Sequence, residues 1–335
     1  MRGPLKILGL LMAMYFSLGG FIGFSKAVAA ETMTLRYAGD LPVGNHLTRG
    51  QEFFAERVKE ISKGRVSIEV YTAGTLFTAK DFTKALPAGA VDMAQSLITL
   101  WSGLVPAANF TDMPLFFDNW PHAWRVYDSE VGEILRKEME KAGVKVLFWM
   151  QDGKAGFASK RPLNTLNDFK GKRIRAPGEL MSHTIRALGG VPTFMGGGEV
   201  YLALQRGTVD GAISSLTSFV DRKYYEVTKY VTEPNFAFGL YACMINLNKW
   251  NSLPPHIQKI LLAAGQKTQE WGRKEVEKSD LAALDELKKK GMEIHFLQKT
   301  EKEAWRKACK PVYDLVIQKA GPLGPKMFEL ANKLR

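Results

Sequence analysis

Residues 171–212 read GKRIRAPGELMSHTIRALGGVPTFMGGGEVYLALQRGTVDGA and decide the fold class. Residues 172–176 are predicted to form a strand, which the following Pro-Gly pair ends because proline removes a backbone donor. Residues 199–206 are predicted to form a helix, and Gly207 suits the left-handed position just after it. A Val-Asp pair then opens a second apolar strand. Strand, helix and strand in this order predict an α/β protein with mostly parallel pairing.

The end of this stretch has a counterpart earlier in the chain. Residues 203–212 read ALQRGTVDGA, and residues 85–94 read ALPAGAVDMA. Each segment reads as the end of a helix, a glycine, and a Val-Asp pair that opens a strand. The spacing places one copy in each half of the chain, so we expect two lobes built on the same α/β scheme. Asp92 and Asp210 are expected to act as structural caps in those lobes.

Apolar periodicity extends this scheme to other segments. Residues 33–38 and 66–71 are predicted strands, with an i, i+4, i+7 helical pattern from Phe54 between them. Residues 144–150 are a predicted strand that runs into a Gln-Asp-Gly turn, interpreted as a crossover or hinge, and residues 235–246 are a strand that crosses back. Few helix breakers occur from residue 254 to residue 290, which predicts one long helix spanning both lobes. The tail from residue 300 is predicted to be mainly helical.

The first thirty residues differ from the rest. A basic start, an apolar run and an Ala-Val-Ala end predict a cleaved signal peptide over residues 1–30, with an uncleaved membrane anchor as the alternative. The formal charge of +12 falls to +9 without the three basic residues of this segment. Export favours anionic small molecules or simple solubility over nucleic acid as the reason for this charge. A buried, free Cys243 is preferred to a disulfide with Cys309.

The sequence offers no convincing catalytic set. Its five histidines are scattered without metal-ligand spacing, and the G-x-S-x-G, H-E-x-x-H and P-loop patterns are missing. We therefore expect neither a metal nor a cofactor. A periplasmic enzyme that uses Asp40, His46 or Asp210 as acid–base groups is one alternative, and a nucleic-acid binder is another. An exported two-lobed α/β protein without catalytic groups is typical of a solute receptor that closes on its ligand by hinge motion.

The stretch 171–212 resembles the signature region of the C4-dicarboxylate-type solute receptors of TRAP (tripartite ATP-independent periplasmic) transporters. The resemblance rests on a strand with an arginine before a proline and on the pattern V-x-x-A-L-Q-x-G-x-V-D-G, and it extends over essentially the whole mature chain. It implies a two-lobed periplasmic binding protein fold, each lobe a mixed, mostly parallel sheet flanked by helices. It also implies a periplasmic receptor, not an enzyme, that captures an organic acid and delivers it to TRAP permease membrane subunits. We expect a monomer. The predicted boundaries are 1–30 for the signal peptide, 31–153 plus 242–275 for lobe 1, 154–241 plus 276–320 for lobe 2, and 321–335 for a C-terminal helical tail.

The resemblance places the carboxylate-binding arginine at Arg175. An arginine suits this role because a guanidinium pairs with a carboxylate through two nitrogens. A second arginine that many members carry is replaced by Ala155 at the matching position, which argues against a ligand with two buried carboxylates. Aromatic residues near the predicted strand ends favour a monocarboxylate, such as an aromatic, hydroxy or keto acid. A C4-dicarboxylate or a sugar acid is the alternative ligand. The candidate ligand-binding residues are Arg175, Ser214, Thr217, Phe219, Trp101, Ser96, Asn45, Gln151, Phe157 and Phe238.

Overall fold

The computed structural model describes residues 32–335, and the predicted signal peptide over residues 1–30 lies outside the described residues. The strands are β1 (Met33–Gly39), β2 (Val66–Tyr71), β3 (Met93–Leu97), β4 (Val144–Ser159), β5 (Arg173–Ala176), β6 (Val191–Phe194), β7 (Gly211–Ser215), β8 (Tyr230–Asn246) and β9 (Glu293–His295). The α-helices are α1 (His46–Ile61), α2 (Phe82–Ala85), α3 (Trp120–Asp128), α4 (Glu130–Lys141), α5 (Glu179–Ala187), α6 (Val200–Arg206), α7 (Leu216–Asp221), α8 (Leu247–Ser252), α9 (Pro255–Lys289), α10 (Lys299–Lys319) and α11 (Leu323–Lys333).

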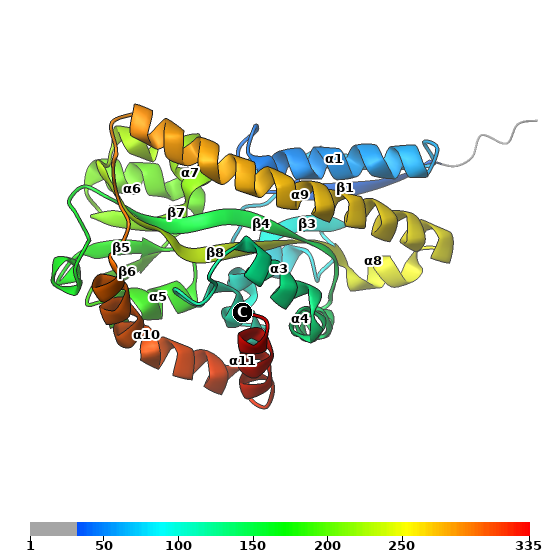
Figure 1. Cartoon of the computed structure of the whole chain (residues 1–335). Coiled ribbons are helices and arrows are strands. Elements are labelled where there is room, and N and C mark those ends of the chain that lie inside the picture. The colour runs from blue at the N-terminus through cyan, green and yellow to red at the C-terminus, as the bar shows by residue number, and fades with distance from the viewer. Residues whose placement is uncertain (1–31) are drawn as a thin grey trace, which may run out of the picture. The chain divides into compact units, whose positions relative to one another are not determined.

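The strands form one sheet in the order β2-β1-β3-β8-β4-β7-β5-β6, with β9 paired to β8. Its two outer parts are parallel, because β1 pairs with β2 and β3, and β5 pairs with β6 and β7. The long antiparallel pair of β4 and β8 joins these parts (Figure 1). The mixed, mostly parallel α/β architecture predicted from the sequence is confirmed.

Strand β4 runs without interruption through residues 151–153, so the turn predicted there is wrong. Its register against β8 shifts between Gln151 and Gly153, and again between Ala155 and Phe157. Gly153 has a φ of +120°, which residues with a Cβ rarely adopt. The Gln-Asp-Gly sequence therefore makes a bulge inside a strand rather than a turn between two strands. Strand β8 likewise begins at Tyr230, ahead of the predicted start at residue 235.

The predicted long helix is present as α9, and close packing explains its internal glycines. The helix lies against β4 and α1 (Figure 1). A Cβ at Gly265 would lie 2.8 Å from Cδ1 of Phe148, and a Cβ at Gly272 would lie 2.5 Å from Sδ of Met150. A Cβ added at Gly50 of α1 would lie 2.7 Å from Cε of the same methionine. The glycines let both helices approach the strand.

The two Val-Asp segments serve equivalent roles in the two parallel parts of the sheet. Asp92, just before β3, accepts a hydrogen bond from the Arg36 N–H of β1 at 2.9 Å. Asp210, just before β7, accepts one from the Arg173 N–H of β5 at 2.9 Å. The glycines that precede them have φ angles of 74° and 72°. Each aspartate thus fixes the backbone of a neighbouring parallel strand, as the repeated motif predicts.

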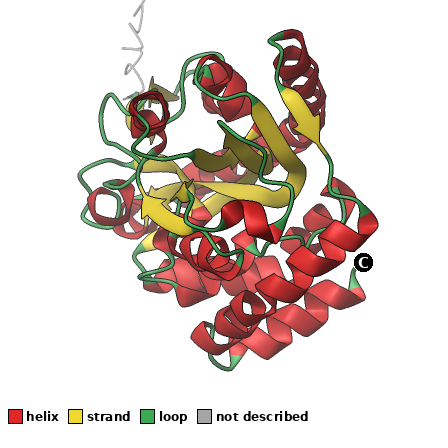
Figure 2. Cartoon of the chain, turned by 90° about the vertical axis from the view of Figure 1, so that its left-hand side faces the viewer, coloured by secondary structure: helices red, strands yellow, loops and turns green. Residues whose placement is uncertain are grey.

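Helices cover both faces of the sheet (Figure 2). Along β1, Tyr37 packs into a core cluster with residues of α1 and α9, whereas Ala38 packs into one with residues of α3, α4, α10 and α11. This alternation follows from the two-residue period of a strand. Cys243 and Cys309 are both buried and free. Within residues 32–335, the helices do not combine the length and the apolar character that a membrane span needs.

Candidate functional site

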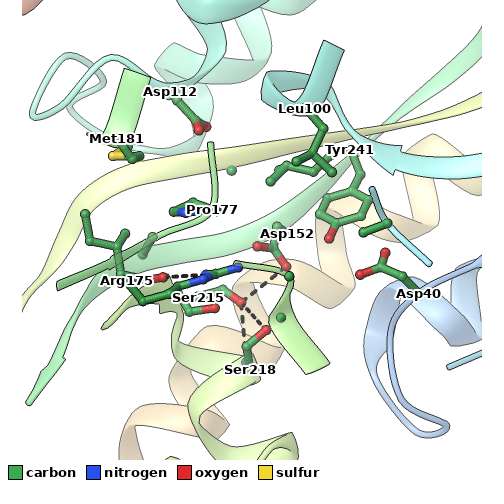
Figure 3. Close-up of a pocket in the computed structure, with 18 of the residues that line it drawn as sticks. Asp40, Leu100, Asp112, Asp152, Arg175, Pro177, Met181, Ser215, Ser218 and Tyr241 are labelled. Atoms are coloured by element: carbon green, nitrogen blue, oxygen red, sulfur yellow. Dashed lines mark hydrogen bonds between the residues drawn. The ribbon is translucent and has the colours of Figure 1, made fainter. Parts of the chain in front are cut away.

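A cavity lies where the carboxyl ends of β1, β5 and β7 face the middle of β4 and β8. Ligands of α/β proteins bind at such strand ends. The lining includes apolar side chains, three serines and the aromatic residues Phe194 and Tyr241. The charged residues of the lining are Asp40, Lys80, Asp112, Asp152, Arg175 and Arg222. Figure 3 shows several of these side chains converging on the same space.

Arg175 lies near the end of β5 with only 5 % of its surface exposed. Its Nε donates to the Met195 carbonyl at 3.1 Å, and its Nη1 donates to the Ile213 carbonyl at 2.8 Å. Among residues 32–335, no acceptor bonds to Nη2. Burial lowers the pKa of the guanidinium, so an added negative charge would stabilise its charged form. Two protein carbonyls thus fix the side chain, while both N–H groups of Nη2 and the second N–H of Nη1 are left for a ligand.

The hydroxyl of Ser215 links the end of β7 to the bulge of β4. It donates to Oδ1 of Asp152 at 3.2 Å and lies 2.9 Å from the Ser218 hydroxyl (Figure 3). It also accepts from the Ser218 N–H, which caps the start of α7. Burial raises the pKa of Asp152 to about 7, partly offset by the Ser215 hydrogen bond. The network holds a carboxyl group that titrates near neutral pH at the cavity wall.

A second arginine lies at this cavity, contrary to the expectation drawn from Ala155. Arg222 follows α7, and its Nη2 lies 3.9 Å from Oδ2 of Asp40. Its guanidinium packs over Gly197, where a Cβ would lie 2.9 Å from Cζ. Burial raises the pKa of Asp40, and the Arg222 charge opposes that rise. Ala155 does line the cavity, but the missing cation is supplied by a helix end from another part of the chain.

Asp112 ends the 3-10 helix Pro106–Asp112 and is 4 % exposed. Burial raises its pKa to about 6, and the nearby Thr99 hydroxyl opposes part of that rise. The Thr99 hydroxyl nevertheless lacks a partner at hydrogen-bonding distance and angle within residues 32–335. Unlike Asp40 and Asp152, Asp112 has no well-formed hydrogen bond or ion pair from its carboxylate to the described residues. The cavity therefore contains one buried carboxylate that this part of the chain leaves unpaired.

An ion pair bridges one side of the cavity. Nζ of Lys80, in the loop before α2, lies 2.6 Å from Oε1 of Glu199 at the start of α6. The same Nζ lies 5.7 Å from the ring centroid of Phe194 at the end of β6. Lys80 and Glu199 belong to segments that the sequence assigns to different lobes. The contact joins those segments beside the site.

The structure brings only part of the predicted site to this cavity. Arg175 and Ser214 line it. Asn45 and Thr217 instead line a separate depression beside α9, where the Asn45 amide donates to Asp221 at 2.6 Å. Gln151 is buried in β4, and its carbonyl is 2.8 Å from Nε2 of His46.

The predicted aromatic walls do not line this cavity. Phe157 packs against Trp305 of α10 with ring centroids 5.6 Å apart, and Phe238 packs against Trp120 of α3 at 4.8 Å. Both rings fill the core because sequence position near a strand end does not fix which face a side chain takes. The other predicted residues that are buried away from the lining are Ser96, Trp101 and Phe219, with Nε1 of Trp101 donating to Ser96 Oγ at 3.1 Å.

Sequence reasoning missed several lining residues. Asp112 carries a usable signal, since it is the one charge in the apolar run NFTDMPLFF at 109–117, and a charge in such a run is rarely buried without a role. Arg222 carries none, because a basic residue after a short helix is ordinary. From the sequence, Asp40 is predicted only as a possible acid–base group. Within residues 32–335, no cluster of three or more acidic, histidine or cysteine side chains is arranged to hold a metal ion.

Asp280 of α9 holds the β4 bulge from the other side. Its carboxylate accepts from the Lys154 N–H at 3.1 Å and from Nε1 of Trp120 at 3.0 Å. A Cβ at Gly153 would lie 2.8 Å from its Oδ1. Burial raises the pKa of Asp280 to about 7. The long helix is thus joined to the strand segment that carries Asp152.

This raised pKa predicts that acid stabilises the protein between about pH 4 and pH 7. An aspartate in the unfolded chain has a pKa of about 3.9, so the folded state binds more protons in this interval and stability falls as pH rises. We expect Asp280→Asn to flatten the rise in melting temperature from pH 8 to pH 5. One such group changes the free energy of unfolding by at most about 1.4 kcal/mol per pH unit.

The matched control is Asp285→Asn, an exposed position on the same helix. Burial lowers the pKa of His46 to about 4, which opposes the trend, but His46 acts equally in all three proteins. An Asp280→Asn variant with the unaltered slope of melting temperature against pH would contradict the assignment.

Comparisons with known proteins agree with this geometry. Residues 38–319 match the family model described as bacterial extracellular solute-binding protein, family 7 (DctP). The chain is 29% identical over 307 residues to the C4-dicarboxylate-binding periplasmic protein DctP of Rhodobacter capsulatus, covering 90% of this chain and 91% of that protein.

Two solved structures of TRAP periplasmic solute-binding proteins share the fold. One, from Roseobacter denitrificans with bound β-D-glucuronate, is 27% identical with a TM-score of 0.85, covering 89% of this chain and 98% of that one. The other, from Sulfurospirillum deleyianum with bound succinate, is 27% identical with a TM-score of 0.85, covering 91% and 100%. The predicted periplasmic binding protein fold is confirmed.

Proposed function

Because the chain belongs to bacterial extracellular solute-binding protein family 7 and is a TRAP-type receptor for organic acids rather than an enzyme, we propose that it binds a monocarboxylate at Arg175. The observation that carries this proposal is the free Nη2 of a buried, fixed guanidinium at the cavity wall, among the residues 32–335. A carboxylate there would make a charge-assisted bond in a site with little competing water. Ser214 is a further proposed ligand contact.

The charge of the cavity supports one carboxylate rather than two. Arg222 is already paired with Asp40, and Asp152 adds another acidic group close to the same space. A dianion would bring a second negative charge among these carboxyl groups, and the arginine nearest to receive it is already engaged. The bound glucuronate of one relative has a single carboxylate, whereas the succinate of the other has two. Both relatives thus bind ligands of the alternative classes, a sugar acid and a C4-dicarboxylate, and the sugar acid shares its single carboxylate with the proposed ligand.

The lining also favours one kind of monocarboxylate. The aromatic side chains expected at the site lie in the core, and the lining carries several hydroxyl and carboxyl groups beside the aromatic residues Phe194 and Tyr241. These features support a hydroxy or keto acid over an aromatic acid.

We propose that the ligand is enclosed by movement of two lobes, 31–153 with 242–275 and 154–241 with 276–320. The bulges of β4 at residues 151–157 support this division, since irregular strand segments accept changes in backbone angle more readily than regular ones. The Lys80–Glu199 pair and the hydrogen bond from Nε1 of Trp120 to Asp280 join the two lobes and would hold the closed arrangement. The closed receptor would then deliver its ligand to the membrane subunits of a TRAP permease. The similarity to the periplasmic protein DctP of Rhodobacter capsulatus supports a periplasmic location for this chain.

A thermal-shift screen tests the proposed ligand class. A ligand at one hundred times its Kd stabilises the folded state by about 2.7 kcal/mol, which corresponds to a rise in melting temperature of roughly 5–10 °C. We expect such rises with hydroxy and keto monocarboxylates such as lactate and pyruvate, and none with the corresponding amides, which lack the carboxylate. Large shifts confined to C4-dicarboxylates or to sugar acids would instead establish the alternative receptor.

A further inference from the structure

Asp112 is the feature of the cavity that an arginine–carboxylate pair does not explain. It is 4 % exposed, and its carboxylate is directed into the cavity beside Met181 (Figure 3). The other two aspartates of the lining are partly exposed and have partners: Asp152 has the Ser215 hydroxyl, and Asp40 has Arg222. No well-formed hydrogen bond or ion pair from residues 32–335 reaches the carboxylate of Asp112.

An unpaired carboxylate in this position is costly, because burial removes water without supplying another donor. The cavity lining also contains donor side chains such as Ser214, Tyr241 and Lys80, but within residues 32–335 none of them forms a hydrogen bond with the Asp112 carboxylate. Burial raises the pKa of Asp112 only to about 6, so the group is mostly ionised at neutral pH. Its unmet requirement is a hydrogen-bond donor.

Among the described residues, the cavity contains an unpaired donor and an unpaired acceptor, which are complementary. Within the described chain, Nη2 of Arg175 lacks an acceptor, and the carboxylate of Asp112 lacks a donor. They lie on separate elements, β5 and the 3-10 helix Pro106–Asp112, and both residues line the same cavity. A ligand with a carboxylate and a separate donor group would satisfy both at once. A second carboxylate on the ligand would face Asp112 with like charge, and a methyl group would leave it unpaired.

We propose that Asp112 accepts a hydrogen bond from the ligand and thereby selects carboxylates that carry a hydroxyl, N–H or ammonium group away from the carboxylate. The inference rests on the proposed function, since Arg175 must hold the carboxylate. It narrows the ligand class from monocarboxylates in general to donor-bearing ones.

The test is calorimetric titration of the full mature chain with linear acids of three to five carbons. In each length series the end remote from the carboxylate is a methyl, a hydroxyl, an ammonium or a second carboxylate, as in butyrate, 4-hydroxybutyrate, 4-aminobutyrate and succinate. D-Glucuronate extends the panel to a larger donor-rich acid. We expect the best hydroxyl- or ammonium-ended acid to bind about 10- to 100-fold tighter than its methyl-ended counterpart.

Two substitutions separate recognition from folding. Asp112→Leu removes the acceptor and is expected to abolish the preference for donor-ended acids while binding to methyl-ended acids is kept. Asp112→Asn keeps the shape and a carbonyl acceptor, so it should retain a preference for hydroxyl ends but lose at least about tenfold in affinity for ammonium ends. Asp285→Asn, on the exposed side of α9, serves as the control and should leave the ranking unchanged.

The outcomes are distinguishable. Methyl- or dicarboxylate-ended acids that bind as tightly as donor-ended ones would overturn the role of Asp112. So would a preference for donors that survives in Asp112→Leu, because some other residue would then be the acceptor. If none of the acids binds, D-glucuronate included, the proposed receptor function is contradicted. This outcome differs from the others because binding is then lost whatever group the acid carries at the end remote from its carboxylate.

Discussion

Replacing Arg175 with alanine is expected to reduce carboxylate binding by at least about 30-fold. Truncating one partner of a buried, hydrogen-bonded charge pair costs about 2–5 kcal/mol, and each 1.4 kcal/mol is tenfold in affinity. The fixed geometry makes the loss large, since Met195 and Ile213 hold the guanidinium in place before the ligand arrives. Titration calorimetry with the tightest-binding acid from the thermal-shift screen measures the effect.

Two variants control this experiment. Arg175→Lys keeps the charge but loses the planar fork, so we expect weak binding rather than none. Arg173→Ala removes an arginine from the same strand that is exposed and paired with Asp210. It should leave affinity unchanged, and near-UV circular dichroism should show that all three variants fold. Affinity of Arg175→Ala within about threefold of the unaltered protein would rule out the proposed site.

Replacing Gly272 with leucine is expected to lower the free energy of unfolding by about 3 kcal/mol. Its Cβ would lie 2.5 Å from Sδ of Met150, and that side chain is fully buried between α9 and α1. Gly50 prevents Met150 from moving toward α1 without a new clash. Overpacking of this kind costs about 1–3 kcal/mol and occasionally more. Chemical denaturation gives the energy, and the melting temperature should fall by roughly 5–10 °C.

The double variant Gly272→Leu with Met150→Ala tests the stated cause. Shortening Met150 creates space that the new leucine can enter, so the two losses should not add. Ala263→Leu, an exposed position on the same helix, should change stability by less than about 0.5 kcal/mol. Additive losses in the double variant would show that the leucine acts through some contact other than Met150.

Local periodicity predicts those elements whose stability is local. The bounds of β2 and α9 follow from alternation and from the scarcity of helix breakers, and the structure reproduces both within a residue or two. The central strands are different. The Gln-Asp-Gly sequence at 151–153 has the composition of a turn, but pairing with β8 and the Asp280 contact keep the strand continuous. Those partners lie far away in the sequence, and no local pattern reveals them.

The same distinction applies to the site. Arg175 and Ser214 are found because a family motif marks them, and both line the cavity. Asp112 and Arg222 reach the cavity from short elements that no strong pattern identifies. Phe157 and Phe238 lie near the expected places along their strands, but they fill the core. Which face a side chain takes depends on register, and the bulges of β4 change that register.

The position of β8 in the sheet has a consequence for how the chain folds. This strand fills the gap between β3 and β4, with Met93 opposite Ile245 and Val144 opposite Asn246. Before residue 246 has left the ribosome, β3 and β4 each present an unpaired edge, and neither can complete its hydrogen bonds. Such long-range pairing delays folding and leaves edges on which other chains can add. The centre of the sheet can therefore form only after the chain has been made through residue 246.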